Sequence, residues 1–463
     1  MGVVFQDKQP ATGRLTAVDN EGRDRCALGG LQLEMLPRMP LATADAARPV
    51  IDGGAFLESP GAPIDVPAAL PHTPRVVRLP AAPQPAAGHV VVIMPRCRHD
   101  NVRISHKIAW SLRQRGYRIT LVSAEAPESC YLGMHVVKAS APFRSILRPL
   151  LNLPSQLRQA LDLRADLYLA YNPDALLVGI ALAMLGRRVA YDTAEDFSLR
   201  PFIHPTVPRM LAPLIARMLE GGERLLGRRA VSACVTQAQM QARRGGSLLL
   251  ENAPLTEGPV VDAADRFAPS IRRPDADLCL IYAGSITRLR GLERMLDLLV
   301  RLNRDLRARM ILIGSFSPAD LVNDARRHAG WRHVDYHGLV PHHESLAWIR
   351  CADLGLALLE PVADYPTSSI TKLYEYMQCG TPFVASDFAA WRASIGGVDA
   401  GLFVDPGDVE TTASRILELA ADPARLGEKR RAGQRYIEEH FNWQRVSRPF
   451  MALVDRVLAS GRT

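Results

Sequence analysis

Short apolar runs of strand length alternate with segments of helical spacing from about residue 89 onward. Residues 90–94 form a continuous apolar run, residues 104–115 carry helical spacing, and residues 119–122 form the next apolar run. Short apolar strands that alternate with amphipathic helices are typical of parallel sheets covered by helices on both faces. The pattern predicts a Rossmann-like α/β domain over residues 88–255.

A second alternating series begins after a segment without periodicity. Residues 256–277 are rich in Pro, Asp, Arg and Ala, which is typical of an interdomain linker. Strands are then expected at 278–282, 310–313, 334–336, 354–358 and 383–385. The fold class is therefore predicted as α/β with two tandem Rossmann-like domains, the second over residues 278–430. In such sheets ligands bind outside the carboxyl ends of the strands, so we expect the site in a cleft between the domains.

The first part of the chain has a different character. Residues 1–87 are rich in Pro, Ala and Gly and show no sustained period of 2 or 3.6. This composition predicts a flexible, low-complexity extension.

Composition and charge narrow the class of protein. The chain has 463 residues, of which 48% are hydrophobic and 22% charged, and this length favours more than one folded domain. The net charge of +8 favours an anionic partner. Aromatic residues make up only 6%, and no basic tract contains interleaved aromatics, so we expect no nucleic-acid partner.

Cysteine usage and hydropathy bear on the compartment. The seven cysteines are scattered without a C-x-x-C pair, which favours a reducing compartment. The longest apolar run, at 175–185, is shorter than the ~20 residues of a spanning helix, and the N-terminus lacks a signal-peptide pattern. We expect a cytoplasmic protein, with contact at the inner face of the membrane as an open alternative.

A polar loop leads into a short helix between residues 365 and 382. Ser368 or Ser369 is expected to cap the start of this helix, and Gly380 to end it.

Thr371, Lys372 and Glu375 are spaced to share one face of that helix. Free amides at the start of the helix and a carboxylate one turn further on would hold a diphosphate at its tip and a ribose along its side. An amphipathic surface helix with a Lys–Glu pair explains the same pattern, so both interpretations stay open.

A second candidate segment directly follows the strand predicted at 278–282. Gly284 and Gly291 bracket a loop that carries Arg288 and Arg290. Arginine suits bidentate contact with phosphate, and such a loop would neutralise a departing diphosphate. The alternative is a solvated turn between a strand and a helix.

A third group lies in the first domain. Asp192, Glu195 and Asp196 follow a strand expected at 188–191. These acids would orient sugar hydroxyls or bind a cation, or else Asp192 or Asp196 would simply cap a helix.

Residues 372–377, Lys-Leu-Tyr-Glu-Tyr-Met, are followed at 380–386 by Gly-Thr-Pro-Phe-Val-Ala-Ser. Together they resemble the signature helix and strand of family 4 glycosyltransferases, which have the GT-B fold. Further resemblances follow the order of the chain: residues 100–103 with Lys107 and 116–117, residues 251–254, residues 284–291, and Asn442 with Trp443. The resemblance spans about residues 90–459.

The resemblance implies roles for individual residues. Glu375 would bind the ribose hydroxyls, Arg290 would take the position of a phosphate-binding Lys, and the amides near Ser369 and Ile370 would approach the diphosphate. Members of the family typically retain the anomeric configuration and need no metal, so no cofactor is expected besides the donor substrate. The resemblance also implies that residues 431–463 form a C-terminal helix crossing back to the first domain.

The chain departs from the family pattern at three positions. Thr367 replaces a Glu that touches the transferred sugar in many members, Ser285 replaces a basic residue, and Ala194 replaces an active-site His. The expected catalytic residues are Arg290, Thr367, Asp192 and Glu195. The expected donor-binding residues are Gly284, Ser285, Arg288, Arg290, Ser368, Ser369, Ile370, Thr371, Lys372 and Glu375.

No metal site is expected from the sequence. Asp275 and Asp277 have the D-x-D spacing of metal-dependent glycosyltransferases, but they precede a strand inside the linker. His337, His342 and His343 lack Cys or carboxylate partners at ligand spacing, and we interpret them as loop histidines.

The predicted function is transfer of a sugar from a nucleotide-diphosphate donor to a lipid-linked or polysaccharide acceptor of a cell-envelope pathway. Thr367 and Ala194 keep open a scaffold or binding protein that has lost turnover, and a nucleotide-sugar epimerase on the same fold is a further alternative. Four arginines surround apolar residues and indicate either a surface for anionic lipid or an ordinary helix face: Arg144, Arg148, Arg158 and Arg164.

Overall fold

The computed structural model divides the chain into two compact units, Met1–Ala68 and Ala69–Thr463. It describes residues 3–5, 15–18, 24–27, 33–35, 88–141, 148–199, 201, 207–236, 247–362, 365–367 and 371–460.

The first unit contains four short strands that the sequence analysis did not predict. They are β1 (Val3–Phe5), β2 (Leu15–Val18), β3 (Asp24–Ala27) and β4 (Leu33–Met35), in the order β1-β4-β2-β3. The prediction of a flexible extension over 1–87 falls mostly outside the described residues and stays a prediction.

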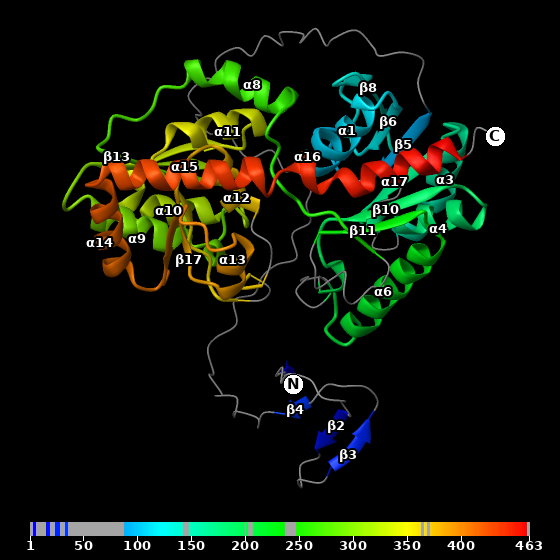
Figure 1. Cartoon of the computed structure of the whole chain (residues 1–463), viewed down its shortest axis with the longest axis horizontal. Coiled ribbons are helices and arrows are strands. Elements are labelled where there is room, and N and C mark those ends of the chain that lie inside the picture. Colours follow the sequence, from blue (N-terminus) through cyan, green and yellow to red (C-terminus); the bar gives the residue numbers. More distant parts are fainter. Residues whose placement is uncertain are drawn as a thin grey trace. The chain divides into compact units, whose positions relative to one another are not determined.

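The second unit begins with a largely parallel sheet (Figure 1). Among the described residues it has eight strands in the order β12-β11-β10-β9-β5-β6-β8-β7, and β7 alone runs antiparallel to its neighbour. The strands are β5 (His89–Met94), β6 (Arg118–Ser123), β7 (Cys130–Tyr131), β8 (Met134–Lys138), β9 (Leu167–Tyr171), β10 (Val189–Thr193), β11 (Ser232–Val235) and β12 (Leu248–Leu249). Its helical segments are η1 (Val102–Ala109), α1 (Trp110–Gln114), α2 (Arg148–Leu151), α3 (Leu153–Asp162), η2 (Pro173–Ala175), α4 (Leu176–Met184), η3 (Phe197–Leu199) and α6 (Ala212–Arg229).

Both faces of this sheet are buried, as alternation along β5 illustrates. Val90 and Val92 pack in one apolar cluster, whereas Val91 and Ile93 pack in a second cluster on the other face. Successive strand residues point to opposite faces, so a strand covered on both sides needs a continuous apolar run. The run at 90–94 is apolar throughout for this reason.

The second sheet is entirely parallel among the described residues and has the order β15-β14-β13-β16-β17-β18. Its strands are β13 (Leu278–Ala283), β14 (Ala308–Ile313), β15 (Val334–Gly338), β16 (Leu354–Ala357), β17 (Phe383–Ser386) and β18 (Gly401–Val404). Its helical segments are η5 (Arg288–Arg290), α9 (Leu292–Leu302), α10 (Leu321–Arg327), η6 (Ala329–His333), α11 (His342–Cys351), α12 (Thr371–Gln378), α13 (Ala389–Ser394), α14 (Val409–Ala420) and α15 (Pro423–Glu439). The predicted fold class of two tandem α/β domains is confirmed.

The segment expected to be an irregular linker contains a helix. Within 256–277 the structure has α8 (Pro259–Phe267) and η4 (Ala268–Ser270). Val261 packs in the core of the first domain, whereas Val260 packs in a core cluster of the second. Pro259 stands at the first position of this helix, and Val260, Val261 and Ala264 form its buried face.

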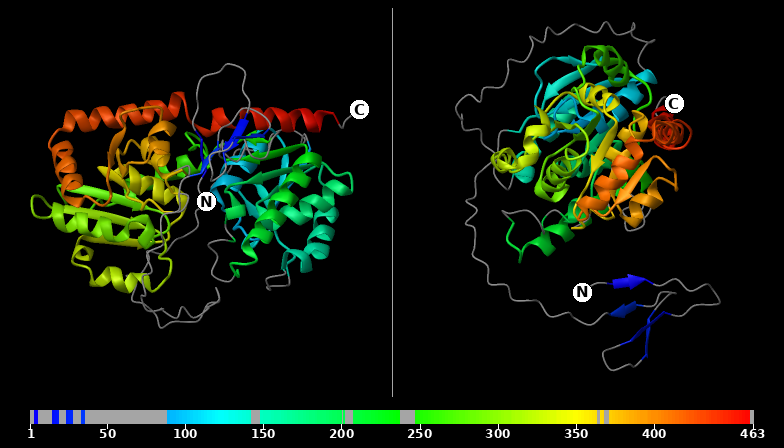
Figure 2. Two further views of the ribbon diagram at one scale, coloured as in Figure 1. Left: turned by 90° about the horizontal axis from the view of Figure 1, so that it is seen from below. Right: turned by 90° about the vertical axis from the view of Figure 1, so that its left-hand side faces the viewer.

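The C-terminal segment returns to the first domain. After α16 (Trp443–Val446), α17 (Arg448–Ala459) places Phe450, Met451 and Val454 in the same cluster as Val90. Figures 1 and 2 show α16 and α17, in red, running alongside the first sheet. Trp443 anchors the turn, because its backbone N–H donates to Pro254 (2.8 Å) and its indole N–H to Ser111 (2.9 Å).

Phe450→Ala should destabilise the first domain by about 3–5 kcal/mol, because it removes a buried aromatic ring and leaves a cavity. Urea unfolding followed by circular dichroism measures the change. Arg448→Ala, at an exposed position of the same helix, is the control and should stay within about 0.5 kcal/mol of the wild type. Equal stabilities of the two variants would contradict the packing of α17 described above.

Candidate functional site

Helix α12 presents three polar residues on one side and buries four apolar or aromatic residues on the other. Leu373, Tyr374, Tyr376 and Met377 are buried, whereas Thr371, Lys372 and Glu375 are partly exposed. This is the division of faces that the spacing predicts. Ser368, Ser369 and Ile370, expected at the start of the helix, lie outside the described residues.

The loop after β13 is shaped by glycines in a conformation that other residues rarely adopt. Gly284 has φ +140° and Gly314, after β14, has φ +139°. A Cβ on Gly314 would lie only 1.8 Å from the carbonyl oxygen of Gly284, so the two loops approach too closely for any side chain there. Further along, the Thr287 hydroxyl accepts from the Arg290 N–H at 3.1 Å and fixes the turn that carries Arg290.

Gly284 lies beside two cationic side chains that are far apart in the sequence. The position of a Cβ on Gly284 would be 3.3 Å from Lys372 Nζ and 4.0 Å from Arg290 Nη1. Lys372 Nζ also lies 3.4 Å from the centroid of the Tyr282 ring. The structure therefore brings together three of the expected donor-binding residues, at the carboxyl end of β13.

Burial and the neighbouring Arg290 charge both shift the pKa of Lys372. Burial lowers the pKa of Lys372 well below its usual value, the Arg290 charge lowers it further, and Glu375 opposes the shift. Two neighbouring cations in a partly desolvated site favour an anion beside them. The arrangement is thus suited to an anionic ligand.

Glu375 lies on the same face of α12 as Lys372. It has a partner, His342, that the sequence did not predict. His342 Nε2 lies 3.1 Å from Glu375 Oε1, and the Glu375 side chain is 23% exposed. Burial by itself would raise the pKa of Glu375, but His342, Lys107 and Lys372 outweigh burial and hold the pKa below its usual value. Glu375 is therefore an ionised hydrogen-bond acceptor near neutral pH.

The interpretation of three histidines as loop residues is wrong. His342 and His343 begin α11, and His337 lies in β15 with its ring 4.3 Å from that of Trp348. The first turn of α11 follows Pro341, a residue type common near helix starts, so the sequence did carry a signal for this helix.

The two arginines of the loop after β13 differ in their surroundings. Arg288 is about half exposed and forms ion pairs with Glu293 and Asp324, whereas Arg290 is partly buried beside Gly284. Arg288 is therefore engaged away from the other expected donor-binding residues. The Ser285 carbonyl accepts from the Tyr282 hydroxyl at 2.7 Å, which places Ser285 in the same turn.

In the first domain, Asp192 has a role that neither sequence interpretation included. Its carboxylate accepts two hydrogen bonds from Arg103, at 2.8 and 2.6 Å, and the two side chains are 0% and 4% exposed. Arg103 also donates to the Leu250 carbonyl at 2.9 Å. Asp192 is thus a buried ion-pair partner, and it neither caps a helix nor presents a free carboxylate to a sugar.

Its neighbour Asp196 does act as a cap. The Asp196 carboxylate accepts from the Ser198 N–H (3.3 Å) and hydroxyl (2.6 Å) at the start of η3. Glu195 lies two residues after β10, and its backbone carbonyl accepts from the Thr193 hydroxyl at 3.0 Å.

Lys107 and Asn252 reach α12 from the first-domain side and were absent from the predicted site. Lys107 Nζ donates to Asn252 Oδ1 at 2.8 Å, and Asn252 Nδ2 lies 3.4 Å from Thr371 Oγ1. Burial lowers the pKa of Lys107 to about 7, and Glu375 opposes this shift. Both residues lie in segments on which the family resemblance rests, so the sequence did carry a signal for them.

Lys107 lies on η1, an eight-residue π-helix in which Arg103, Ser105 and His106 are buried as well. His106 Nε2 lies 2.6 Å from the Tyr131 hydroxyl, and burial lowers the pKa of His106 to about 3. π-Helical turns are rare and occur frequently at functional sites. η1 therefore buries four polar side chains, those of Arg103, Ser105, His106 and Lys107.

Thr367 is exposed in the short described stretch 365–367. Asp275 and Asp277 pair with Arg307 at 3.2 and 3.1 Å. Within the ranges that the structure describes, no three His, Cys, Asp or Glu side chains are grouped as metal ligands would be. No helix in those ranges combines the length and hydropathy needed to cross a bilayer.

Comparison with known proteins finds relatives among glycosyltransferases. Residues 277–422 match the family model of glycosyl transferases group 1. A glycogen synthase of Mycobacterium tuberculosis is 25% identical over 368 residues, 78% of this chain and 85% of that protein. A phosphatidyl-myo-inositol mannosyltransferase of Mycolicibacterium smegmatis is 26% identical over 246 residues, 52% of this chain and 59% of that protein.

Among solved structures, HepE of Anabaena in complex with UDP superposes with a TM-score of 0.58 at 14% identity. The match covers 80% of this chain and all of that one. The predicted GT-B fold is confirmed by this likeness.

Asp192→Asn should destabilise the first domain by about 3–5 kcal/mol, because it leaves the buried Arg103 guanidinium without a counter-charge. Asp196→Ala, which removes only a cap near the same strand end, should cost about 1 kcal/mol. Urea unfolding compares the two variants. If Asp192→Asn loses no more stability than Asp196→Ala, the ion pair does not stabilise this domain.

Proposed function

We propose that the chain, a glycosyltransferase whose residues 277–422 form a group 1 domain, transfers a sugar from a nucleotide-diphosphate donor to a lipid-linked or polysaccharide acceptor. The observation that carries the proposal is the position of Lys372 and Arg290 beside Gly284.

The diphosphate is assigned to these two cations. Gly284 has no side chain, so an anionic group can approach the backbone at the point where Lys372 and Arg290 converge. Arg290 offers a planar fork that suits phosphate oxygens, and Lys372 adds a compact charge. A diphosphate there would offset both the burial and the Arg290 charge that lower the pKa of Lys372.

The ribose of the donor is assigned to Glu375. An ionised carboxylate accepts hydrogen bonds from neighbouring hydroxyls, and His342 and Lys107 keep Glu375 ionised. Thr371 and Lys372 lie one turn earlier on the same face of α12. The diphosphate and the ribose would therefore lie along one helix.

The chemical step would depend mainly on stabilising the departing diphosphate. Negative charge develops on the leaving group as the glycosidic bond to it breaks, and preorganised cations reduce that cost in a site with little water. Arg290 and Lys372 supply this charge without a metal ion. We propose that transfer proceeds with retention and without a metal or other cofactor, as the family resemblance implies.

The acceptor is assigned to the first domain, where Lys107 and Asn252 reach towards α12. The relative that acts on a phosphatidyl-myo-inositol, according to its name, supports a lipid acceptor. A lipid-linked acceptor would place the enzyme at the cytoplasmic face of a membrane.

Thr367 supports a second candidate function. A Glu is expected there if the enzyme grips the transferred sugar as many relatives do, and Thr supplies no carboxylate. A scaffold that binds nucleotide without turnover is therefore the rival.

Incubation with UDP-, GDP- and ADP-sugars, with and without an acceptor extract, separates the enzyme from the scaffold, because a scaffold gives neither transfer nor donor hydrolysis. Conversion of a donor without acceptor would instead indicate an epimerase.

Glu375→Ala should weaken binding of the preferred nucleoside diphosphate by about 1–3 kcal/mol, because it removes hydrogen bonds from the ribose to a charged acceptor. Titration calorimetry with the ribonucleotide and its 2′-deoxy analogue tests this assignment, since the wild type should favour the ribonucleotide and Glu375→Ala should not.

Glu418→Ala, an exposed carboxylate on α14, is the matched control and should bind as the wild type does. Unchanged affinity in Glu375→Ala would remove Glu375 from the donor site.

Binding of the diphosphate should be accompanied by proton uptake. Lys372 has a lowered pKa in the free protein, and the ligand's negative charge raises it, so Lys372 gains a proton and affinity falls as pH rises through the free-protein pKa. Calorimetry in buffers of different ionisation enthalpy measures the uptake, expected at about one proton or less.

Lys372→Arg keeps a permanent cation and should reduce this uptake, whereas Lys138→Arg at an exposed position should not. Identical uptake in wild type and Lys372→Arg would contradict contact between Lys372 and the diphosphate.

A further inference from the structure

The first half of helix α6 exposes large apolar side chains and buries small ones, whereas Leu226 near its end is buried in the core. Met210, in the turn before the helix, is 91% exposed, and Leu214 and Met218 are 56% and 68% exposed. The buried residues in the first turns of α6 are Ala212 and Ala216. Because positions four residues apart share a helix face, Met210, Leu214 and Met218 form one outward stripe.

This division is the reverse of the usual one. A surface helix of a globular protein normally directs its large apolar side chains towards the core and its polar ones to water. Contiguous exposed apolar residues commonly mark a surface that another molecule covers. The stripe continues to Leu225, which is 38% exposed, so it follows most of the helix.

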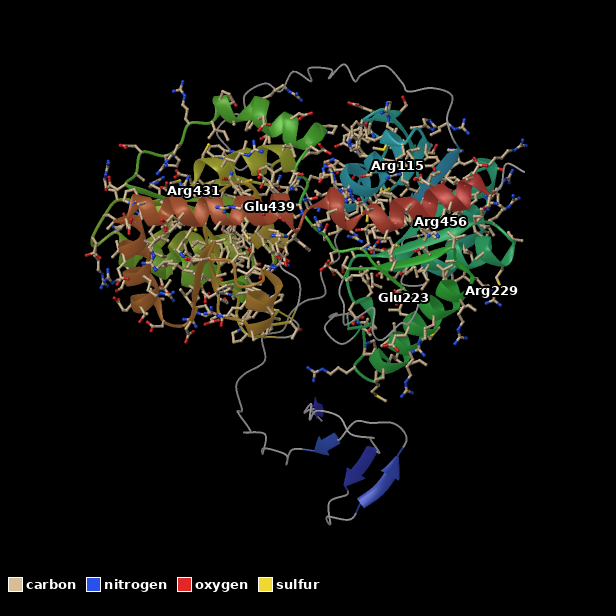
Figure 3. The ribbon with its side chains drawn as sticks, in the orientation of Figure 1. Arg115, Glu223, Arg229, Arg431, Glu439 and Arg456 are labelled. Atoms are coloured by element: carbon tan, nitrogen blue, oxygen red, sulfur yellow. The ribbon has the colours of Figure 1, made fainter. Side chains whose placement is uncertain are left out.

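The residues that flank the stripe are basic. Arg209 and Arg217 are exposed beside Met210 and Met218, and Arg228 and Arg229 are exposed at the end of the helix. Figure 3 labels Arg229 at this end.

The acids of α6 do not offset these arginines. Glu220 is paired with Arg224 at 2.9 Å. Glu223 is buried and accepts from the Tyr191 hydroxyl at 2.9 Å. Arg209, Arg217, Arg228 and Arg229 therefore give the exposed side of α6 a net positive charge.

We propose that α6 docks on an anionic lipid surface, with Met210, Leu214 and Met218 entering the boundary of the acyl chains and the flanking arginines contacting acidic headgroups. Apolar side chains combined with a basic rim are the features of helices that lie in a membrane interface. The positive charge favours a lipid surface over an apolar protein partner, because a layer of acidic headgroups complements all four arginines that flank the stripe at once.

The segment around Arg144, Arg148, Arg158 and Arg164, expected as an alternative surface for lipid, is described only in part, since residues 142–147 lie outside the described residues. In α3, Leu157 packs against the core of the first domain, and Arg158 lies 3.9 Å from Asp162. In α2, Leu150 and Leu151 are 61% and 43% exposed, but the arginine expected beside them at position 144 lies outside the described residues. The outward stripe on α6 was hidden in the sequence because only tertiary packing shows which face is covered.

Co-sedimentation of the full chain with vesicles tests the proposal. We expect binding to phosphatidylcholine vesicles that contain about 30% phosphatidylglycerol to exceed binding to pure phosphatidylcholine by about tenfold or more, because each arginine near an anionic surface adds to the attraction. Equal binding to the two vesicles, or no binding to either, would overturn it.

Two variants separate the apolar and the charged contributions. Met210→Ser with Leu214→Ser and Met218→Ser should reduce vesicle binding about tenfold or more. Arg209→Gln with Arg217→Gln should reduce the preference for anionic vesicles. Met184→Ser with Leu185→Ser, at exposed apolar positions outside the stripe, is the matched control and should bind as the wild type does.

The substituted side chains are exposed, so thermal unfolding and nucleotide-diphosphate binding should be unchanged in all variants. Failure of the donor assignment would thus leave this result intact, and the reverse also holds. If the serine variant binds vesicles like the wild type, the proposal is wrong. A wild-type dimer that the serine variant dissociates, without vesicle binding, would assign the stripe to a second copy of the chain instead.

Discussion

The constraint on which the site depends is the proximity of two cations with little water around them. Lys372 Nζ and Arg290 Nη1 both lie near the place where Gly284 lacks a side chain, and burial together with Arg290 lowers the pKa of Lys372. Two neighbouring cations with little water around them cost free energy unless an anion neutralises them. Glycines allow the two loops at this place to approach each other, because the backbone of Gly314 lies against the carbonyl of Gly284 and leaves no room for a side chain. A diphosphate supplies the missing charge, so binding and leaving-group stabilisation follow from one arrangement.

The first domain contributes a second group of buried polar residues. Its π-helix η1 directs Arg103 into an ion pair with Asp192 and Lys107 towards Asn252. The ion pair holds Asp192 at the end of β10, while Lys107 stabilises the ionised form of Glu375 on α12. The two domains thus meet through charged residues whose ionisation depends on one another.

The sequence predicted the two α/β domains and the polar face of α12 because both follow from local periodicity. It missed β18 (Gly401–Val404), which is short and begins with Gly, and the helix in the linker, whose apolar residues divide between two cores. Contacts between distant residues were also missed. His342 lies 33 residues from Glu375 and Asp192 lies 89 from Arg103, so only tertiary packing brings each pair together.

The central claim is that a nucleoside diphosphate binds where Gly284, Arg290 and α12 converge. Hydrogen–deuterium exchange of the full chain, with and without a saturating nucleoside diphosphate, tests it most directly. The account predicts that protection increases at the amides of residues 284–291 and 371–378, with smaller changes elsewhere in the second domain. Protection confined to the first domain, or none at these two segments under saturating ligand, would contradict it.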